Sequence, residues 1–218
     1  MQNNKPQILE LFATPVYVTQ MPDSIASIIP FLDAQTPNSG SDEANYGERS
    51  ENSYILNEPE CASVKNYLLN QVNDYASNTL LYDYDSYNLS QSWVSRKQPG
   101  QHHSMHTHPN SLISGVFYYG EPSPKTPAIK FHKMTGGFNV SYIQPDVKAD
   151  KRPSKFAWNE FAVEFNPGML LLFPSYLFHS VPINESDKVR SSVAFNVVSG
   201  GNLGSEKNLT ELRYDKVK

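Results

Sequence analysis

Cysteine is almost absent from this sequence, since Cys61 is the only one in 218 residues. One cysteine excludes an internal disulfide, and such sparse use fits a reducing compartment. No apolar run approaches the roughly 20 residues that a membrane-spanning helix requires. The first residues also lack the charged-then-apolar pattern of a secretory signal. We therefore expect a protein that neither spans a membrane nor depends on disulfides.

An excess of basic charge is missing too, because the formal net charge is -4 at pH 7. Proteins that bind nucleic acids or anionic membranes usually carry a basic face, and this chain gives no electrostatic case for either partner. Repeats with solenoid periods are also missing. A small molecule or a peptide is the partner class that remains, and the sequence does not determine the oligomeric state.

Aromatic residues, proline and glycine are abundant. The chain has 13 tyrosines and 11 phenylalanines, which favour strands over helical bundles, and 16 prolines and 11 glycines, which favour turns. Its length suits one domain with a substantial core. The composition therefore predicts a mainly β domain.

The N-terminal part contains the best helix of the chain, from Pro59 to Thr79. Proline suits the first turn of a helix. Apolar residues recur at spacings that form one stripe, which we expect to pack on the outside of a sheet: Val64, Leu68, Val72 and Tyr75.

Before this helix, Ile8 to Thr19 is typical of an extended segment. Pro15 places it at the edge of a sheet, because proline cannot donate a ladder hydrogen bond. Pro22 to Pro30 is compatible with a short helix. Gln35 to Ser53 is polar and predicts a surface loop, with an active-site lid as the alternative.

From Leu89 onward the sequence consists of short strands separated by turns. The predicted strands cover 89–97, 112–119, 128–133, 156–165, 169–173 and 189–199, and a turn at 135–137 and a charged loop at 148–154 interrupt them. Several short strands after one helix indicate a sandwich or barrel, and a jelly roll satisfies the pattern with two sheets.

Four of the six histidines fall between His102 and His108, directly before the apolar run that starts at Leu112. Imidazole is the commonest metal ligand. His106 and His108 are two residues apart, so on a strand they share a face and can reach one ion. The alternative is a hydrophilic loop with solvated histidines, and we assign that role to His102 and His103.

A second group follows the buried strand 169–173. His179 lies just past it, where a lone histidine is usually a satisfied core residue. Eleven positions later, Arg190 opens the last strand, and Ser192 shares its face because strand side chains alternate. A buried arginine needs an anionic partner. An internal carboxylate and a ligand carboxylate, held bidentately, are both possible.

Together these residues resemble the Fe(II)/2-oxoglutarate-dependent oxygenases. The resemblance rests on two histidines before a strand, a distant histidine after a buried strand, and an Arg-x-Ser pair beyond it. It extends from about Ser92 to Val198. The segments HTHPNSLISGVFYY, GMLLLFPSYLFHSVP and RSSVAFNVV are similar to a prolyl-hydroxylase-like branch common in marine bacteria and their phages.

The resemblance implies a double-stranded β-helix, or jelly roll, that uses Fe(II), 2-oxoglutarate and O2. His106 and His179 match the family's two histidine ligands. Residue 108 is where the family places a carboxylate, and His108 there implies either a three-histidine metal site or a carboxylate from elsewhere. Arg190 and Ser192 match the pair that binds the far carboxylate of 2-oxoglutarate, and Tyr118 matches a tyrosine that hydrogen-bonds it. A core tyrosine is the alternative for Tyr118.

We therefore expect one domain with three parts. Residues 1–88 form a strand, a loop and the supporting helix, residues 89–200 form the β-helix core, and residues 201–218 form a polar tail. The expected activity is hydroxylation of an unknown substrate coupled to decarboxylation of 2-oxoglutarate, in the cytoplasm of a bacterial or phage-infected cell. The rivals are a cupin-like three-histidine enzyme without 2-oxoglutarate, and a non-catalytic jelly roll used for binding or in a virion. His132 has no assigned role.

Overall fold

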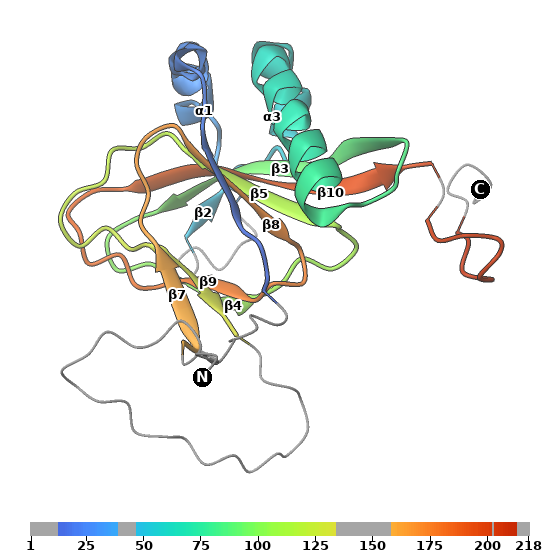
Figure 1. The fold of residues 1–218 in the computed structure, drawn as a ribbon. Coiled ribbons are helices and arrows are strands. Elements are labelled where there is room, and N and C mark those ends of the chain that lie inside the picture. The colour runs from blue at the N-terminus through green and yellow to red at the C-terminus, as the bar shows by residue number, and fades with distance from the viewer. Residues whose placement is uncertain (1–12, 39–46, 134–157, 202, 213–218) are drawn as a thin grey trace, which may run out of the picture.

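Two antiparallel sheets form the protein (Figure 1). The computed structural model describes residues 13–38, 47–133, 158–201 and 203–212. The six-stranded sheet has the order β1 (Tyr17–Gln20), β8 (Met169–Pro174), β5 (Ile113–Tyr118), β10 (Arg190–Gly200), β3 (Ser86–Lys97) and β2 (Glu48–Arg49). The four-stranded sheet has the order β4 (His103–His106), β9 (His179–Val181), β6 (Ile129–His132) and β7 (Glu160–Val163).

Helices cover one face of the six-stranded sheet, with α1 and α3 on the side away from β4, β7 and β9 (Figure 1). The helical elements are η1 (Asp23–Ile28), α1 (Ile29–Asp33), η2 (Ile55–Asn57), η3 (Pro59–Cys61), α3 (Ala62–Asp74) and η4 (Tyr75–Leu80), the last a π-helix. The helix predicted at 59–79 is therefore confirmed, with a 3-10 turn at its start and a π-turn at its end. None of the helices in the described ranges is long and apolar enough to cross a membrane.

The larger core lies between these helices and the sheet. The predicted stripe on the helix is buried there, and it packs with alternate residues of the central strands: Val193, Phe195 and Val197 from β10, Ile113 and Phe117 from β5, and Leu170 and Leu172 from β8. Burying each such side chain contributes about 1.5–3 kcal/mol before entropy costs. The helical layer is therefore held on the sheet by the apolar side chains at alternate positions of these strands.

A smaller core lies between the two sheets. It takes the residues of opposite parity, Val116 and Tyr118 from β5 and Leu171 and Phe173 from β8, and packs them against Ile129 and Phe131 of β6. β5 and β8 are therefore buried on both faces, which the continuous apolar run at 169–173 predicts for β8. The expected mainly β fold with a supporting helix is confirmed.

Two N-terminal predictions need correction. The loop predicted at 35–53 contains a short strand, because Glu48 and Arg49 pair with Arg96 and Ser95 of β3. The helix predicted at 22–30 starts as a 3-10 helix and continues to Asp33. The edge strand predicted at 8–19 is confirmed where it is described, because β1 pairs only with β8 at one end of the sheet. Residues 39–46, 135–137 and 148–154 lie outside the described ranges, so the lid, turn and charged-loop predictions there stay open.

A close contact between Gly115 and Phe195 generates a test of this packing. The two residues are cross-strand partners on β5 and β10, and a Cβ atom at Gly115 would lie 2.1 Å from the Phe195 ring. We expect Gly115→Ala to lower the free energy of unfolding by about 1–3 kcal/mol, the usual cost of overpacking a core. Urea denaturation measures this change. Phe195→Leu in the same chain should recover part of the loss, whereas simple additivity of the two changes would contradict a direct clash.

Candidate active site

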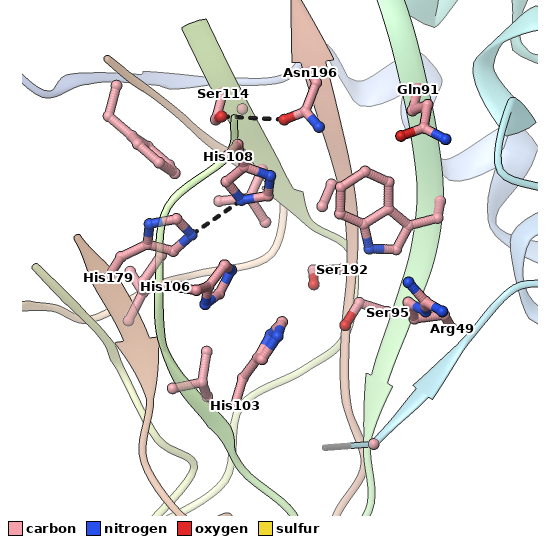
Figure 2. A pocket seen from close by; sticks show the side chains of 18 of the residues that line it. Arg49, Gln91, Ser95, His103, His106, His108, Ser114, His179, Ser192 and Asn196 are labelled. Carbon is pink, nitrogen blue, oxygen red and sulfur yellow. Dashed lines mark hydrogen bonds between the residues drawn. The ribbon is translucent and has the colours of Figure 1, made fainter. Parts of the chain in front are cut away.

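A cavity of about 740 Å³ opens between the two sheets (Figure 2). Its walls come from β3, β5 and β10 of the larger sheet and from β4 and β9 of the smaller one. It occupies the inner face beyond the smaller core, where side chains no longer fill the space between the sheets. Cavities of about 300–1,000 Å³ are typical of ligand sites.

Three histidines converge on this cavity from separate places in the sequence. His106 ends β4, His179 begins β9, and the two are cross-strand partners. His108 follows two residues after His106, held by a hydrogen bond from its backbone N–H to the Ser175 carbonyl (3.0 Å). One ring nitrogen from each residue lies within 4.8 Å of the other two. Figure 2 shows the rings facing one another.

Backbone carbonyls fix two of the three rings. His106 Nδ1 lies 2.8 Å from the Ser104 carbonyl oxygen, and His179 Nδ1 lies 2.9 Å from that of Leu177. A carbonyl only accepts hydrogen bonds, so each Nδ1 carries the proton and each Nε2 presents a lone pair. This is the arrangement in which histidine ligates a metal.

Burial keeps the three imidazoles neutral. It lowers the pKa of His179 to about 3 and that of His108 to about 4, and the neighbouring His106 ring acts in the same direction on both. Burial also lowers the pKa of His106. A metal binds the neutral ring, so the site presents the ligating form at neutral pH.

The spacing of the nitrogens suits a shared ion. His108 Nε2 and His179 Nε2 are 3.2 Å apart. Two nitrogens bound at 2.0–2.1 Å to one ion at a right angle would be about 3 Å apart. Among the described residues, no aspartate or glutamate belongs to this cluster of candidate ligands, which consists of His106, His108 and His179. The donor set therefore fits a divalent metal held by a three-imidazole face.

Arg190 lies in the same cavity and is only 4% exposed. Its Nε donates to the Pro127 carbonyl and one terminal nitrogen donates to the Tyr118 hydroxyl, both at 3.1 Å. The guanidinium also lies over the rings of Tyr118 and Phe165, at 4.9 and 5.1 Å from their centroids. No described carboxylate pairs with it. The sequence left open an internal carboxylate or a ligand carboxylate as the partner of Arg190. The described residues supply no internal carboxylate.

The predicted alternation of the last strand holds in the structure. Arg190, Ser192, Ala194 and Asn196 line the cavity, whereas Val193, Phe195 and Val197 enter the larger core. Tyr118 is the cross-strand partner of Ser192 and is fully buried in the smaller core, where it stacks on Phe165. Tyr118 therefore packs in the core, as one of its two predicted roles requires. Its hydroxyl also contacts Arg190 in the cavity, which is compatible with the other role, a hydrogen bond to a carboxylate.

His103 corrects the prediction of a solvated loop residue. It begins β4 opposite Val181, and its ring stacks on His106 with 4.1 Å between centroids. It lines the cavity, and burial lowers its pKa to about 2. An irregularity in the pairing of β4 with β9, between His103 and His106, is the cause, since regular alternation would place residues three apart on opposite faces. His132 lies in β6 and interacts with the Ser180 hydroxyl at 2.8 Å, outside the cavity.

Several cavity residues were not identified from the sequence. Trp93, Ser95 and Lys97 on β3 line the cavity, as does Arg49 on β2. Figure 2 shows Ser95 and Arg49 side by side, across the cavity from His179. The signal was available for β3, because residues 91, 93, 95 and 97 share strand parity. Arg49 had no such signal, since the two-residue strand that places it forms only by pairing with β3.

Comparison with known proteins identifies the family. Residues 91–196 match a family model described as a putative 2OG-Fe(II) oxygenase. No curated protein shows significant sequence similarity to the chain.

Solved structures give the same fold at low sequence identity. A 2OG-Fe(II) oxygenase family oxidoreductase from Burkholderia pseudomallei aligns with a TM-score of 0.56 at 12% identity, covering 83% of each chain. A prolyl-4-hydroxylase from Pseudomonas putida aligns with a TM-score of 0.56 at 16% identity, covering 86% of this chain and 94% of that one. HygX from Streptomyces hygroscopicus, solved with nickel, 2-oxoglutarate and hygromycin B, has a TM-score of 0.59 at 13% identity and coverage of 86% and 84%.

These similarities confirm the jelly-roll fold predicted from the sequence. The family description confirms the predicted enzyme class, an oxygenase, and at family level its iron and 2-oxoglutarate dependence. The narrower branch of marine bacteria and phages stays a prediction. Through residues 91–196, this chain belongs to the Fe(II)/2-oxoglutarate-dependent oxygenase superfamily.

Proposed function

We propose that the cavity binds Fe(II) through His106, His108 and His179, binds 2-oxoglutarate through Arg190, and hydroxylates a substrate. The observation that carries this proposal is the buried Arg190 guanidinium, which shares a cavity with three convergent imidazoles and has no carboxylate partner among the described residues. A buried cation of this kind is stable only with an anion beside it. A dicarboxylic co-substrate that also reaches the metal meets this need.

Each residue has a physical task in this proposal. The three neutral rings hold the metal and leave its remaining positions open to the cavity. Arg190 binds the far carboxylate with the donors not used by Pro127 and Tyr118. The Tyr118 hydroxyl accepts from Arg190 and is free to donate to the same carboxylate, and Ser192 lies across the strand from it. The co-substrate is thereby aligned between the guanidinium and the imidazoles.

Iron bound here would supply the activation of O2 and the oxidation of a C–H bond, which protein side chains cannot perform. In the overall reaction, one oxygen atom enters succinate and the other enters the new hydroxyl group, while CO2 leaves. The electrons that reduce O2 come in equal parts from 2-oxoglutarate and from the C–H bond. The family acts on small-molecule or peptidyl substrates, and both classes suit the size of the cavity.

A cupin-like activity without 2-oxoglutarate is the second candidate, because His108 takes the place of the family carboxylate. Three neutral ligands leave more positive charge on the metal than two imidazoles and one carboxylate. This candidate leaves the buried Arg190 without a function, so it explains fewer of the observations.

Turnover gives the first test of the oxygenase proposal. We expect purified protein with Fe(II), 2-oxoglutarate and O2 to release succinate slowly without added substrate. The reaction should require all three components, and nuclear magnetic resonance follows succinate directly. Oxygen consumption with no succinate formed would favour the cupin-like alternative.

Metal occupancy tests the ligands. We expect His106→Ala, His108→Ala and His179→Ala each to lower metal affinity by about 100-fold or more, since even loss of an outer contact to a ligand costs 10–100-fold. His108→Asp should retain Fe(II), because a carboxylate oxygen binds at about 2.0–2.2 Å and adds a negative charge. Elemental analysis after dialysis measures occupancy, and His132→Ala is the matched control outside the cluster. Full metal occupancy in His108→Ala would mean that His108 is not a ligand and that only two imidazoles bind the metal.

Co-substrate binding tests Arg190. We expect Arg190→Ala to weaken 2-oxoglutarate binding by about 2–5 kcal/mol, the range for truncating one partner of a buried charge pair. Arg190→Lys should recover only part of this, because an ammonium lacks the planar fork of the guanidinium. Anaerobic calorimetry on metal-loaded protein measures both variants.

A matched ligand makes this test specific. 2-Oxopentanoate has the same chain length as 2-oxoglutarate but lacks the far carboxylate. The parent protein should bind 2-oxopentanoate more weakly than 2-oxoglutarate. Arg190→Ala should leave the affinity for 2-oxopentanoate unchanged. Equal losses for both ligands would mean that Arg190 supports the cavity without contacting the far carboxylate.

A further inference from the structure

Lys97 is a buried cation in the cavity for which the proposed mechanism has no use. It ends β3, is 2% exposed, and its Nζ donates to the Ser95 hydroxyl at 2.9 Å. No described carboxylate lies within ion-pair distance of it. An ammonium has three donors, so Ser95 satisfies only one of them. Leaving a buried charge in this state is costly, which indicates that a partner outside the described chain completes it.

Gly47 holds the lysine in place. It adopts a left-handed conformation, with φ of +79°, that residues with a side chain rarely adopt. A Cβ atom there would lie 2.6 Å from Lys97 Cδ and 3.1 Å from its Nζ. The backbone therefore covers the stem of the lysine closely, and the ammonium is confined to the cavity wall.

Arg49 adds a second cation at the same wall. It is the cross-strand partner of Ser95, the residue that holds the Lys97 ammonium, and directly opposite side chains start about 5 Å apart. No described residue forms a hydrogen bond or ion pair with its guanidinium. Figure 2 places it beside Ser95, across the cavity from His179.

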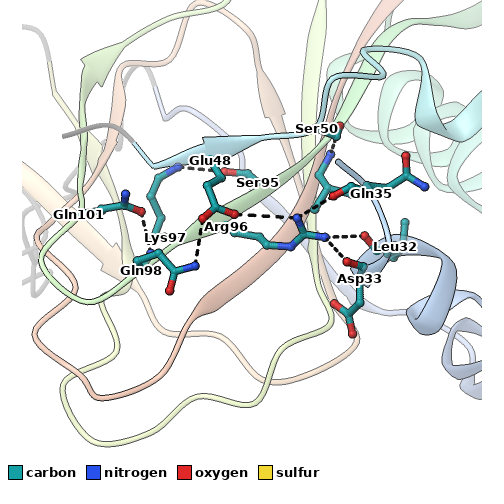
Figure 3. A network of polar contacts seen from close by, with 11 residues as sticks. Leu32, Asp33, Gln35, Glu48, Ser50, Ser95, Arg96, Lys97, Gln98 and Gln101 are labelled. Atoms are coloured by element: carbon teal, nitrogen blue, oxygen red, sulfur yellow. Dashed lines mark hydrogen bonds and ion pairs between the residues drawn. The ribbon is translucent and has the colours of Figure 1, made fainter. Parts of the chain in front are cut away.

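The nearest acidic residue is engaged elsewhere. Glu48 pairs with Arg96 at 4.0 Å and accepts from Gln98 Nε2 at 3.1 Å (Figure 3). Arg96 in turn donates to the carbonyls of Leu32, Asp33 and Gln35 at the end of α1. This network lies on the other face of β2 and β3. Among the described residues, no aspartate or glutamate lines the cavity.

The electrostatics of Lys97 agree with this geometry. Burial lowers its pKa to about 7, the charges of Arg190 and Arg49 act in the same direction, and Glu48 opposes them with a smaller effect. Each of the two guanidinium groups therefore lies close enough to Lys97 to disfavour its charge. An anion bound between them would relieve this repulsion.

The charges of the proposed cofactors leave this wall unneutralised. One carboxylate of 2-oxoglutarate goes to the metal and the other to Arg190, which rests on the function proposed above. We propose that Arg49 and Lys97 form the binding site for an anionic group of the substrate, a carboxylate or a phosphate. The enzyme would then act on an anionic molecule anchored on β2 and β3, with the oxidised carbon held towards the histidines.

Trp93 lies between the proposed anion site, formed by Arg49 and Lys97, and the histidines. It shares the cavity face of β3 with Ser95 and Lys97, and its ring stacks against His108 with 6.0 Å between centroids and 29° between planes. A flat aromatic surface here would contact the part of the substrate between its anion and the reacting carbon. It also gives a direct optical signal for binding in the cavity.

The test is a fluorescence titration that needs no turnover. The chain has two tryptophans, so Trp158→Phe leaves Trp93 as the reporter. The probes are benzoate, phenyl phosphate and neutral benzyl alcohol, added to full-length protein both metal-free with EDTA and loaded with Zn(II) and saturating 2-oxoglutarate. We expect at least one anion to bind about 10-fold or more tightly than benzyl alcohol. The better anion identifies the class of the group.

Variants assign the effect to the two cations. Lys97→Met and Arg49→Gln should each weaken binding of the better anion by about 10-fold, comparable to losing one hydrogen bond to a charged group. Lys65→Met on α3 is the matched control and should change nothing. Lys97→Met removes a buried charge, so this variant should still fold. If it does not, Arg49→Gln still tests the site, because Arg49 is exposed.

Three results would overturn the inference. They are equal binding of anions and benzyl alcohol, unchanged anion binding in both variants, and a loss of 2-oxoglutarate affinity in Lys97→Met as large as that in Arg190→Ala. The last would place Lys97 in the co-substrate site. The metal-free arm separates this inference from the proposed function, because anion binding there persists even if the protein holds no iron.

Discussion

Burial of both faces of the central strands is the constraint on which the rest of the structure depends. β5, β8 and β10 carry apolar side chains of one parity against the helices. Their residues of the other parity face the smaller sheet, where those of β5 and β8 are mostly apolar and those of β10 mostly polar. Because side chains alternate strictly, a strand that satisfies the helical layer also determines which residues face inward. The inner face is filled by aromatic and branched side chains near β6 and by polar ones near β4 and β9. The cavity is the part of the inner face that apolar side chains leave open.

The cavity combines neutral ligands with uncompensated cations. Three imidazoles are held neutral by burial, and Arg49, Lys97 and Arg190 supply positive charge without a described acid among them. Such an arrangement lowers stability in the ligand-free protein, since Lys97 and Arg190 are buried and a buried charge loses hydration. Active sites commonly retain this cost, because the same groups bind charged ligands strongly in a cavity of low dielectric constant. The positive charge of the site is what the proposed dianionic co-substrate and anionic substrate would neutralise.

Rigid elements surround this polar interior. Arg96 connects β3 to the end of α1 through three backbone carbonyls, and Gly47 covers the stem of Lys97. His106 and His179 face each other across one strand pair, with carbonyls orienting both rings. Sites built on strands hold their groups more precisely than sites on loops. Preorganisation of this kind would allow the proposed metal and co-substrate to be positioned without rearrangement of the chain.

Local periodicity was sufficient for much of the structure. The helix at 59–79, the burial of 169–173 on both faces and the alternation from Arg190 to Asn196 follow from side-chain spacing, which depends on backbone geometry alone. Family motifs added His106, His179, Arg190 and Tyr118 as candidate site residues. The tertiary structure decided what depends on pairing between distant strands. Antiparallel pairing of β4 with β9 brings His106 to His179, and pairing of β2 with β3 brings Arg49 beside Lys97. No local pattern encodes such neighbours, because each contact exists only once the two strands have paired.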